Sequence, residues 1–455
     1  MRVWMARDAD NRFEHGFATL PTWLDHREPS LADDRNSILA GDSVLLIVED
    51  DPAFAQILIE GAHQKGLKAV VAMRGSSALT LAKAFRPQAV TLDLLLPDMS
   101  GWTVLDYLKH DPITRHIPVH VISGADNAVE GYALGAMTYL QKASEPDGLD
   151  RLLPVVQTSM QSRRRRILVL ANSEPMRKEI RESLASPGVE FVEAITDADA
   201  EEILEREPVD TIVADWVVSD TCSIEFLERL HARPEPLIPP VAILGPVPID
   251  AGRAAALRQL SRRGAIRYSS SLQHLLHEVA LHLHLAEENM TSDQRTILAG
   301  LLQKDPAFEG KTVLVVDDDL RNIFALTSVL ERQHLNVLHA ETGKGGLEVL
   351  RQNPAIDVIL MDIMMPEMDG YETMRAIRRI PQWAGLPIIA LTAKAMKGDR
   401  EKCLQAGASD YVTKPVDLAL LFSVMRVWLS KSGKSTAALI GTGKARHPHS
   451  DAKRQ

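Results

Sequence analysis

The stretch that decides the fold is residues 358–370, VILMDIMMPEMDG. Its first four residues are apolar, and Asp362 follows them directly. Such a run is too short to cross a membrane and too apolar for a half-exposed strand. It therefore predicts a strand buried on both faces, as in a parallel sheet with helices on each side. Ligands of doubly wound sheets bind at the carboxyl ends of the strands, where Asp362 is expected to lie.

Working outward, the same kind of unit occurs three times in the 455-residue chain. The copies begin with short apolar runs at residues 44–48, 167–171 and 313–316. Helical patterns and further apolar runs then alternate along each copy. This alternation predicts an α/β protein of three consecutive doubly wound (flavodoxin-like) parallel-sheet domains.

The repeats set the expected organisation of the chain. We expect an N-terminal extension, three repeated units, a linking helix and a disordered basic tail. In chain order these are residues 1–42, 43–160 (unit 1), 166–286 (unit 2), 287–310 (the linking helix), 311–430 (unit 3) and 431–455.

Composition excludes several classes of protein. The net charge of −10 argues against a basic surface for nucleic acid, so no nucleic-acid partner is expected. Only two cysteines, Cys222 and Cys403, are present, which excludes a disulfide framework and a cysteine-rich zinc site. No signal peptide and no apolar run of membrane-spanning length is found, so we expect a cytoplasmic protein without a membrane span.

Polar residues follow the strands of unit 3, and together they predict phosphoryl chemistry. They are Asp317, Asp318 and Asp319 after the first strand, Asp362 after the third, Thr392 at the end of the fourth and Lys414 after the fifth. Converging carboxylates repel one another and need a cation, and all-oxygen ligation suits Mg²⁺. Lys414 can offset phosphoryl charge, Asp362 can attack phosphorus, and Thr392 can donate a hydrogen bond to a phosphoryl oxygen.

Unit 1 repeats this pattern with small departures. Its residues are Glu49 and Asp50 after the first strand, Asp93 after the third, Ser123 after the fourth and Lys142 after the fifth. Ser123 lies 30 positions after Asp93, and Thr392 lies 30 positions after Asp362. Lys142 is followed by Ala143 where unit 3 has Pro415, a change that keeps the charge. We therefore expect this site to be chemically competent.

Unit 2 keeps the scaffold and lacks the chemistry. Asp215 follows its third strand, but Asn172 and Ser173 stand where the acid pair is expected. Gly245 replaces the hydroxyl residue, and Ser271 replaces the lysine. The sequence predicts an interaction or spacer module in which Asp215 is not phosphorylated.

These residues resemble receiver domains of two-component response regulators, and the array resembles the C-terminal part of hybrid histidine kinases. The resemblance implies that Asp362, and Asp93 in unit 1, accept the phosphoryl group. It also implies a switch pair of Thr392 and Tyr411. The Mg²⁺ ligands implied are Asp317, Asp318, Asp362 and the Met364 carbonyl in unit 3, with Glu49, Asp50, Asp93 and Leu95 in unit 1.

The expected function is phosphorelay signalling with a histidine kinase or a histidine phosphotransfer protein as partner. The oligomeric state stays open. Receivers catalyse only their own aspartyl phosphorylation and dephosphorylation, and no kinase catalytic domain is found. His277-Glu278 lacks the residues that follow a kinase phosphoacceptor histidine. The alternatives are a non-phosphorylated scaffold, a receiver-only fragment of a hybrid histidine kinase, and an unrelated Mg²⁺-dependent phosphatase or phosphotransferase.

Overall fold

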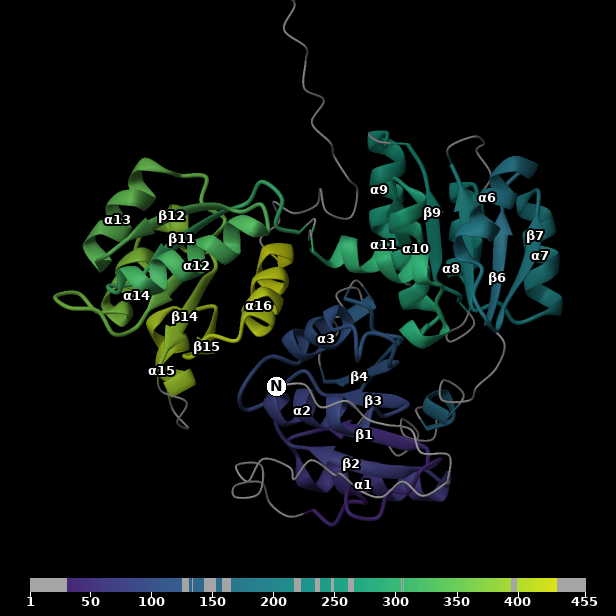
Figure 1. The fold of residues 1–455 in the computed structure, drawn as a ribbon, viewed down its shortest axis with the longest axis horizontal. Helices are drawn as coiled ribbons and strands as arrows, with labels where there is room; N and C mark the ends of the chain where they lie inside the picture. The colour runs from purple at the N-terminus through teal and green to yellow at the C-terminus, as the bar shows by residue number, and fades with distance from the viewer. Residues whose placement is uncertain are drawn as a thin grey trace, which may run out of the picture.

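The fold is taken from a computed structural model. It describes residues 31–124, 131–132, 134–142, 153–157, 165–216, 222–233, 238–246, 249–260, 266–303, 305, 307–393 and 399–431. Most of the expected N-terminal extension and nearly all of the expected basic tail lie outside the described residues. Each unit forms one five-stranded parallel sheet with helices on both faces, as expected for the flavodoxin-like class (Figure 1).

The elements follow the repeat along the chain. Unit 1 contains β1 (Val44–Val48), α1 (Pro52–Gln64), β2 (Lys68–Ala72), α2 (Gly75–Phe85), β3 (Ala89–Leu92), α3 (Gly101–His110), β4 (Val119–Ser123) and β5 (Thr138–Gln141). Unit 2 contains β6 (Arg165–Leu170), α6 (Glu174–Leu184), β7 (Val189–Ala194), α7 (Asp197–Arg206), β8 (Thr211–Asp215), α8 (Ile224–His231), β9 (Val241–Leu244), α9 (Ala251–Leu260), β10 (Ile266–Ser269) and α10 (Leu272–His282).

A short 3₁₀ turn, η1 (Glu287–Asn289), and helix α11 (Ser292–Gln303) link units 2 and 3. Unit 3 contains β11 (Thr312–Val316), α12 (Leu320–Arg332), β12 (Asn336–Ala340), α13 (Gly343–Gln352), β13 (Val358–Asp362), α14 (Gly370–Arg378), η2 (Pro381–Trp383), β14 (Ile388–Thr392), α15 (Asp399–Ala406), β15 (Asp410–Thr413) and α16 (Leu418–Lys431).

The three sheets share one strand order, with the second strand of the unit at one edge, followed by the first, third, fourth and fifth strands. The order reverses between the first and third strands, which is where such sheets bind ligands. Register aligns the units residue by residue. Val48 pairs with Leu92, Leu170 with Ala214 and Val316 with Met361. The residue after each of these pairs therefore occupies the same place in all three units.

Residues 31–42 run beside the edge strand β2 and belong with unit 1. The Asp34 amide donates to the Ala69 carbonyl at 2.9 Å, and the Ala69 amide donates to the Asp34 carboxylate at 2.8 Å. The Val71 amide donates to Asp33 at 2.9 Å. This cover satisfies backbone groups that an open sheet edge would leave unpaired.

The helix after the first strand begins at the same position in every unit. Its N-cap is Asp51 in unit 1, Ser173 in unit 2 and Asp319 in unit 3, and each side chain accepts a backbone hydrogen bond from the first turn. Capping by a polar side chain satisfies an amide that the helix leaves unpaired. In unit 3 the third acid of the Asp317–Asp318–Asp319 triplet is thus a capping residue, and the first two remain for the site.

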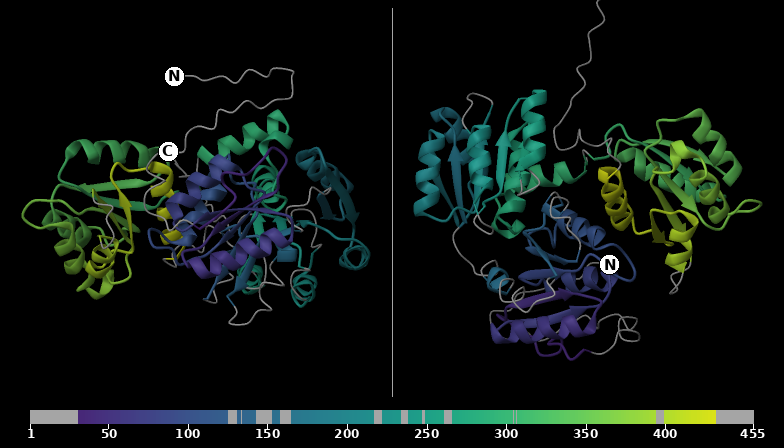
Figure 2. Two further views of the ribbon diagram at one scale, coloured as in Figure 1. Left: turned by 90° about the horizontal axis from the view of Figure 1, so that it is seen from below. Right: turned by 180° about the vertical axis from the view of Figure 1, so that it is seen from behind.

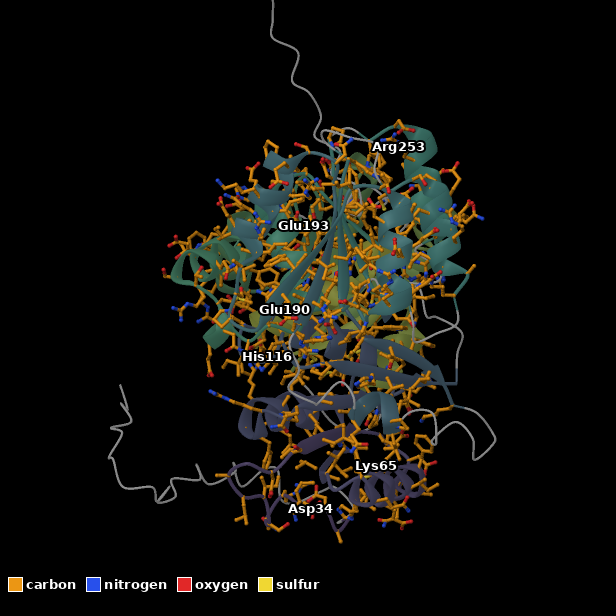
Figure 3. The ribbon with its side chains drawn as sticks, turned by 90° about the vertical axis from the view of Figure 1, so that its right-hand side faces the viewer. Asp34, Lys65, His116, Glu190, Glu193 and Arg253 are labelled. Atoms are coloured by element: carbon orange, nitrogen blue, oxygen red, sulfur yellow. The ribbon has the colours of Figure 1, made fainter. Side chains whose placement is uncertain are left out.

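The units form three lobes, and unit 1 contacts each of the other two (Figures 1 and 2). Helix α16 of unit 3 packs against α3 of unit 1. Figure 3 shows His116 where unit 1 meets unit 2, with Asp34 and Lys65 toward the far end of unit 1. There Arg115 of unit 1 lies 3.3 Å from the ring nitrogen Nδ1 of His277 in unit 2. Within the described part of the chain, no helix is long and apolar enough to cross a membrane.

A glycine packs directly on the carboxyl end of the third strand in units 1 and 3. A Cβ at Gly101 would lie 2.3 Å from the Asp93 carbonyl oxygen, and one at Gly370 would lie 2.2 Å from the Asp362 carbonyl oxygen. Backbone atoms cannot give way as a flexible side chain can. These two positions therefore require glycine so that α3 can start close to Asp93 and α14 close to Asp362.

We predict that Gly370→Ala destabilises unit 3 by about 1–3 kcal/mol, because the added methyl group overpacks the acceptor loop. The matched control is Gly385→Ala, since no atom lies within 4 Å of a Cβ placed there. Calorimetric unfolding of the full chain should show a lower transition temperature for Gly370→Ala alone. Equal transition temperatures for the two variants would refute the close-packing argument.

Candidate functional site

The expected acidic cluster of unit 3 forms at the switch point of the sheet. Asp317 and Asp318 follow β11, Asp362 ends β13, and each offers a carboxylate oxygen within 4.8 Å of the others. Asp317 and Asp362 are buried, while Asp318 is exposed. The strands β11 and β13 are neighbours, so their ends bring the three side chains together. The group could hold a small divalent cation through oxygen ligands.

Lys414 joins the two buried carboxylates of this cluster. Its Nζ lies 2.7 Å from Asp317 Oδ2 and 2.9 Å from Asp362 Oδ2. Burial raises the pKa of Asp362, the hydrogen bond from Lys414 opposes the rise, and the Asp317 charge adds to it. Burial also disfavours the Lys414 charge, but the hydrogen bonds to Asp317 and Asp362 outweigh it and raise the lysine pKa. The lysine therefore stays charged beside Asp362.

The other residues expected in unit 3 border the cluster. Thr392 ends β14 and is buried, and the Lys414 amide donates to its carbonyl at 2.7 Å. The Met364 amide donates to Asp362 Oδ1 at 3.3 Å, and the Met364 side chain is 63% exposed. Sequence reasoning missed Asn322 on α12, whose Nδ2 donates to both Asp317 oxygens at 3.1 and 3.2 Å. Asn322 thus orients the buried acid from the helix side.

Unit 1 assembles an equivalent site. Oxygens of Glu49, Asp50 and Asp93 lie within 4.8 Å of one another. Lys142 Nζ lies 2.9 Å from Glu49 and 2.8 Å from Asp93 Oδ2. The lysine therefore reaches both carboxylates without the proline that follows Lys414 in unit 3. Ser123 ends β4 and is buried.

The single positive charge of Lys142 does not balance the negative charge of the three carboxylates in unit 1. Burial raises the pKa of Glu49 to about 7; Lys142 opposes the rise, and the Asp93 charge adds to it. Burial and the Asp93 charge also raise the pKa of Asp50. Leu95, the counterpart of Met364, has its amide 3.3 Å from Asp93 Oδ1 and a 75% exposed side chain. The site thus holds more negative charge than one lysine neutralises.

Unit 2 lacks the site, and register corrects one part of the expected alignment. Because Leu170 pairs with Ala214, the positions of the acid pair are Ala171 and Asn172, one residue earlier than Asn172 and Ser173. Ser173 is the N-cap of α6. The register confirms that Ser271 stands where the lysine would be, and its side chain caps α10. No group of three metal-ligating side chains forms in the part of unit 2 that the structure describes.

A tyrosine lies at the position of Tyr411 in all three units, and only Tyr411 was expected to have a role from the sequence. Register places Tyr139 of β5 and Tyr268 of β10 at the same point of the sheet. In unit 2 a Cβ on Gly245 would lie 2.3 Å from the Tyr268 hydroxyl. The Tyr268 side chain therefore fills the space that a threonine or serine side chain would take.

The histidine-rich end of unit 2 is a packed helix end. His282 is the last residue of α10, and His277 lies within the helix. Burial lowers the pKa of both to about 4, so they are neutral near pH 7. Among the described residues, no group of three potential metal ligands includes them.

We predict that metal-free unit 1 loses stability as the pH rises from about 4.5 to about 7, the interval between the ordinary Glu49 pKa and its value in the folded chain. Within this interval the unfolded chain releases the proton first, so the folded state is disfavoured by up to about 3 kcal/mol above pH 7. In EDTA, Glu49→Gln should gain stability relative to the wild type between pH 5 and pH 8. Thermal unfolding measures it.

The control for this pH series is Glu60→Gln, which removes an exposed carboxylate from α1 of the same unit. Its offset from the wild type should not vary with pH. A Glu49→Gln offset that is equally constant would contradict the raised pKa.

Comparison with known proteins agrees with this geometry. The family model of the response regulator receiver domain matches residues 45–153 and 313–426, which are units 1 and 3. Protein PilH of Pseudomonas aeruginosa is 36% identical over 118 residues, 26% of this chain and 97% of that protein. The histidine-protein kinase BarA of Escherichia coli is 38% identical over 125 residues, 28% of this chain. The hybrid histidine kinase I of Dictyostelium discoideum is 38% identical over 149 residues, 31% of this chain.

The match covers only 14% and 9% of these two kinases' own lengths. PilH, in contrast, is matched almost end to end by receiver sequence. With two matches to the receiver family model and 97% of PilH covered at 36% identity, the chain belongs to the response regulator receiver family of two-component signal transduction.

Proposed function

We propose that the chain is a phosphorelay protein in which Asp362 and Asp93 each accept a phosphoryl group from a phosphohistidine, while unit 2 accepts none. The observation that carries this proposal is the bridging lysine. Lys414 contacts Asp317 and Asp362, and Lys142 contacts Glu49 and Asp93. Unit 2 has neither the acid pair nor the lysine.

The donor set of each site fits Mg²⁺. Three carboxylates within 4.8 Å of one another face a single lysine, and hard oxygen donors suit this ion. Asp318, Asp317, Asp362 and the Met364 carbonyl would hold it in unit 3, and Asp50, Glu49, Asp93 and the Leu95 carbonyl in unit 1. The bound ion supplies positive charge to the phosphoryl oxygens.

The residues of the chain then carry the transfer. An oxygen of Asp362 forms the new bond to phosphorus as the phosphorus–nitrogen bond of the phosphohistidine breaks, and the imidazole nitrogen keeps the electron pair. Lys414 moves its hydrogen bond from Asp362 to a phosphoryl oxygen and remains paired with Asp317. The Thr392 hydroxyl donates to a second phosphoryl oxygen. Catalysis is then positioning and electrostatic stabilisation.

The acidic cluster of unit 3 (Asp317, Asp318 and Asp362) is called site 3 below. The surface around it suits a partner with an apolar face. Leu320 and Phe324 lie one turn apart on α12 with 58% and 77% of their surface exposed, and Met364 is 63% exposed. Large apolar side chains exposed beside a charged site are typical of an interaction surface. A histidine kinase or a histidine phosphotransfer protein that presents its histidine from an amphipathic helix would cover them.

Unit 2 is proposed as a binding or spacer module, since its sheet is intact and its site is absent. The buried free thiols Cys222 and Cys403 suit a reducing compartment, so we propose that the relay works in the cytoplasm.

We predict that acetyl phosphate with Mg²⁺ labels Asp362 and Asp93 but not Asp215. Mass spectrometry of borohydride-reduced peptides locates the modified aspartates. Asp362→Ala should remove one label and Asp93→Ala the other, while Asp215→Ala should leave both. Labelling that persists in Asp362→Ala at an unchanged level, or that maps to Asp215, would sink the assignment.

We also predict that Asp318→Asn weakens Mg²⁺ binding at site 3 by at least about tenfold, because it removes the exposed carboxylate of the cluster. Isothermal titration in an Asp50→Asn background isolates that site. Asp319→Asn is the matched control, since asparagine caps a helix as well as aspartate does and residue 319 is outside the cluster. Equal losses in both variants would mean that general acidity, not this cluster, binds the ion.

A further inference from the structure

The face of unit 3 formed by α15, β15 and α16 is occupied by unit 1. Helix α16 packs against α3, and Figure 1 shows the two helices side by side between their sheets. Val427 of α16 is fully buried and belongs to the same apolar cluster as Val104 and Leu108 of α3. The apolar core of unit 1 therefore continues into unit 3.

A buried ion pair fixes this contact. Arg426 of α16 donates to Asp106 of α3 at 2.8 Å and to Asp305 at 2.9 Å. The side chain of Asp106 is 1% exposed and that of Arg426 is 12% exposed. Removing one partner of such a pair leaves the other charge buried and uncompensated, which is strongly unfavourable. The pair therefore makes docking specific to these two helices.

A second contact joins the two phosphoryl sites. The hydroxyl of Tyr411, the switch tyrosine of unit 3, donates to the Asp98 carbonyl of unit 1 at 2.8 Å. Asp98 lies in the loop that leads from Asp93 to α3, and its carboxylate accepts hydrogen bonds from the Gly75 and Ser76 amides. The acceptor loop of one receiver thus holds the switch residue of the other.

We propose that unit 1 is an intramolecular partner of this face of unit 3, and that its docking restrains phosphorylation of Asp362. The inference rests on the proposed function of Asp362. A phosphoryl group there draws Thr392 toward it, and an inward turn of Tyr411 must break the bond to Asp98. Docking and the phosphorylated form of unit 3 then compete. Because coupling is reciprocal, undocking must favour phosphorylation by the same factor by which phosphorylation favours undocking.

The test uses a variant in unit 1, so that site 3 stays chemically intact. Asp106→Arg faces Arg426 with a like charge and should separate the two units, which small-angle scattering reports as a larger radius of gyration. In an Asp93→Ala background, only Asp362 is expected to react. The initial rate of labelling by acetyl phosphate should then rise at least about fivefold, because the rate scales with the fraction of the chain in which the two units are undocked. The charge-swapped Asp106→Arg/Arg426→Asp variant, with Asp305→Asn to remove the second carboxylate that faces residue 426, should restore docking and the slow rate.

The other outcomes show whether the docking inference or the proposed function is wrong. An equal rate at Asp362 in the docked and separated forms overturns the inference and leaves the proposed function standing. A scattering profile that Asp106→Arg leaves unchanged also overturns it, because the ion pair would then not hold the interface. Absence of label at Asp362 in every variant refutes the proposed function itself.

Discussion

The contact between one lysine ammonium and two carboxylates is the interaction on which the site depends. Lys414 reaches Asp317 from one strand end and Asp362 from another. These strand ends meet because the order of the sheet reverses between β11 and β13. Three carboxylates against one lysine leave net negative charge, which a bound divalent cation would balance. Folding energy from the apolar sheet thus maintains a charge arrangement that would be repulsive in isolation.

Unit 2 has the same fold without the acidic cluster and the lysine, so it shows which residues take their place. Ala171 stands where an acid would be, and the Tyr268 hydroxyl fills the space beside Gly245. Trp216, the residue after Asp215, is buried and donates from its indole nitrogen to the Cys222 carbonyl. Packing and capping have replaced charge at this edge, so the unit keeps its sheet without needing a cation. This agrees with the binding or spacer role proposed for unit 2, between two copies that keep the acidic cluster and the lysine.

Most of the fold and of the two sites could be predicted because the signals are local. Apolar runs that lead directly into Asp93 and Asp362 predict where these two carboxylates lie in the sheet. The errors arise where local pattern carries no signal. Ala171 is apolar and looks like part of the strand, so the acid pair of unit 2 was expected one residue too late. Asn322 is a single polar residue within a helix, and nothing in the local pattern distinguishes it from a solvent-exposed side chain. The contacts of Tyr411 with Asp98 and of Arg426 with Asp106 join residues 313 and 320 positions apart, which packing alone determines.

The central claim is that this chain carries two complete acceptor sites and one silent copy. Fluorine NMR of the full chain with Mg²⁺ and beryllofluoride, which mimics an aspartyl phosphate, counts them directly. The account predicts bound-fluoride signals from two sites, one set lost in Asp362→Ala, the other in Asp93→Ala and neither in Asp215→Ala. A third set of signals that is lost in Asp215→Ala would contradict the account. Two sets of signals that both remain in Asp362→Ala would contradict it as well.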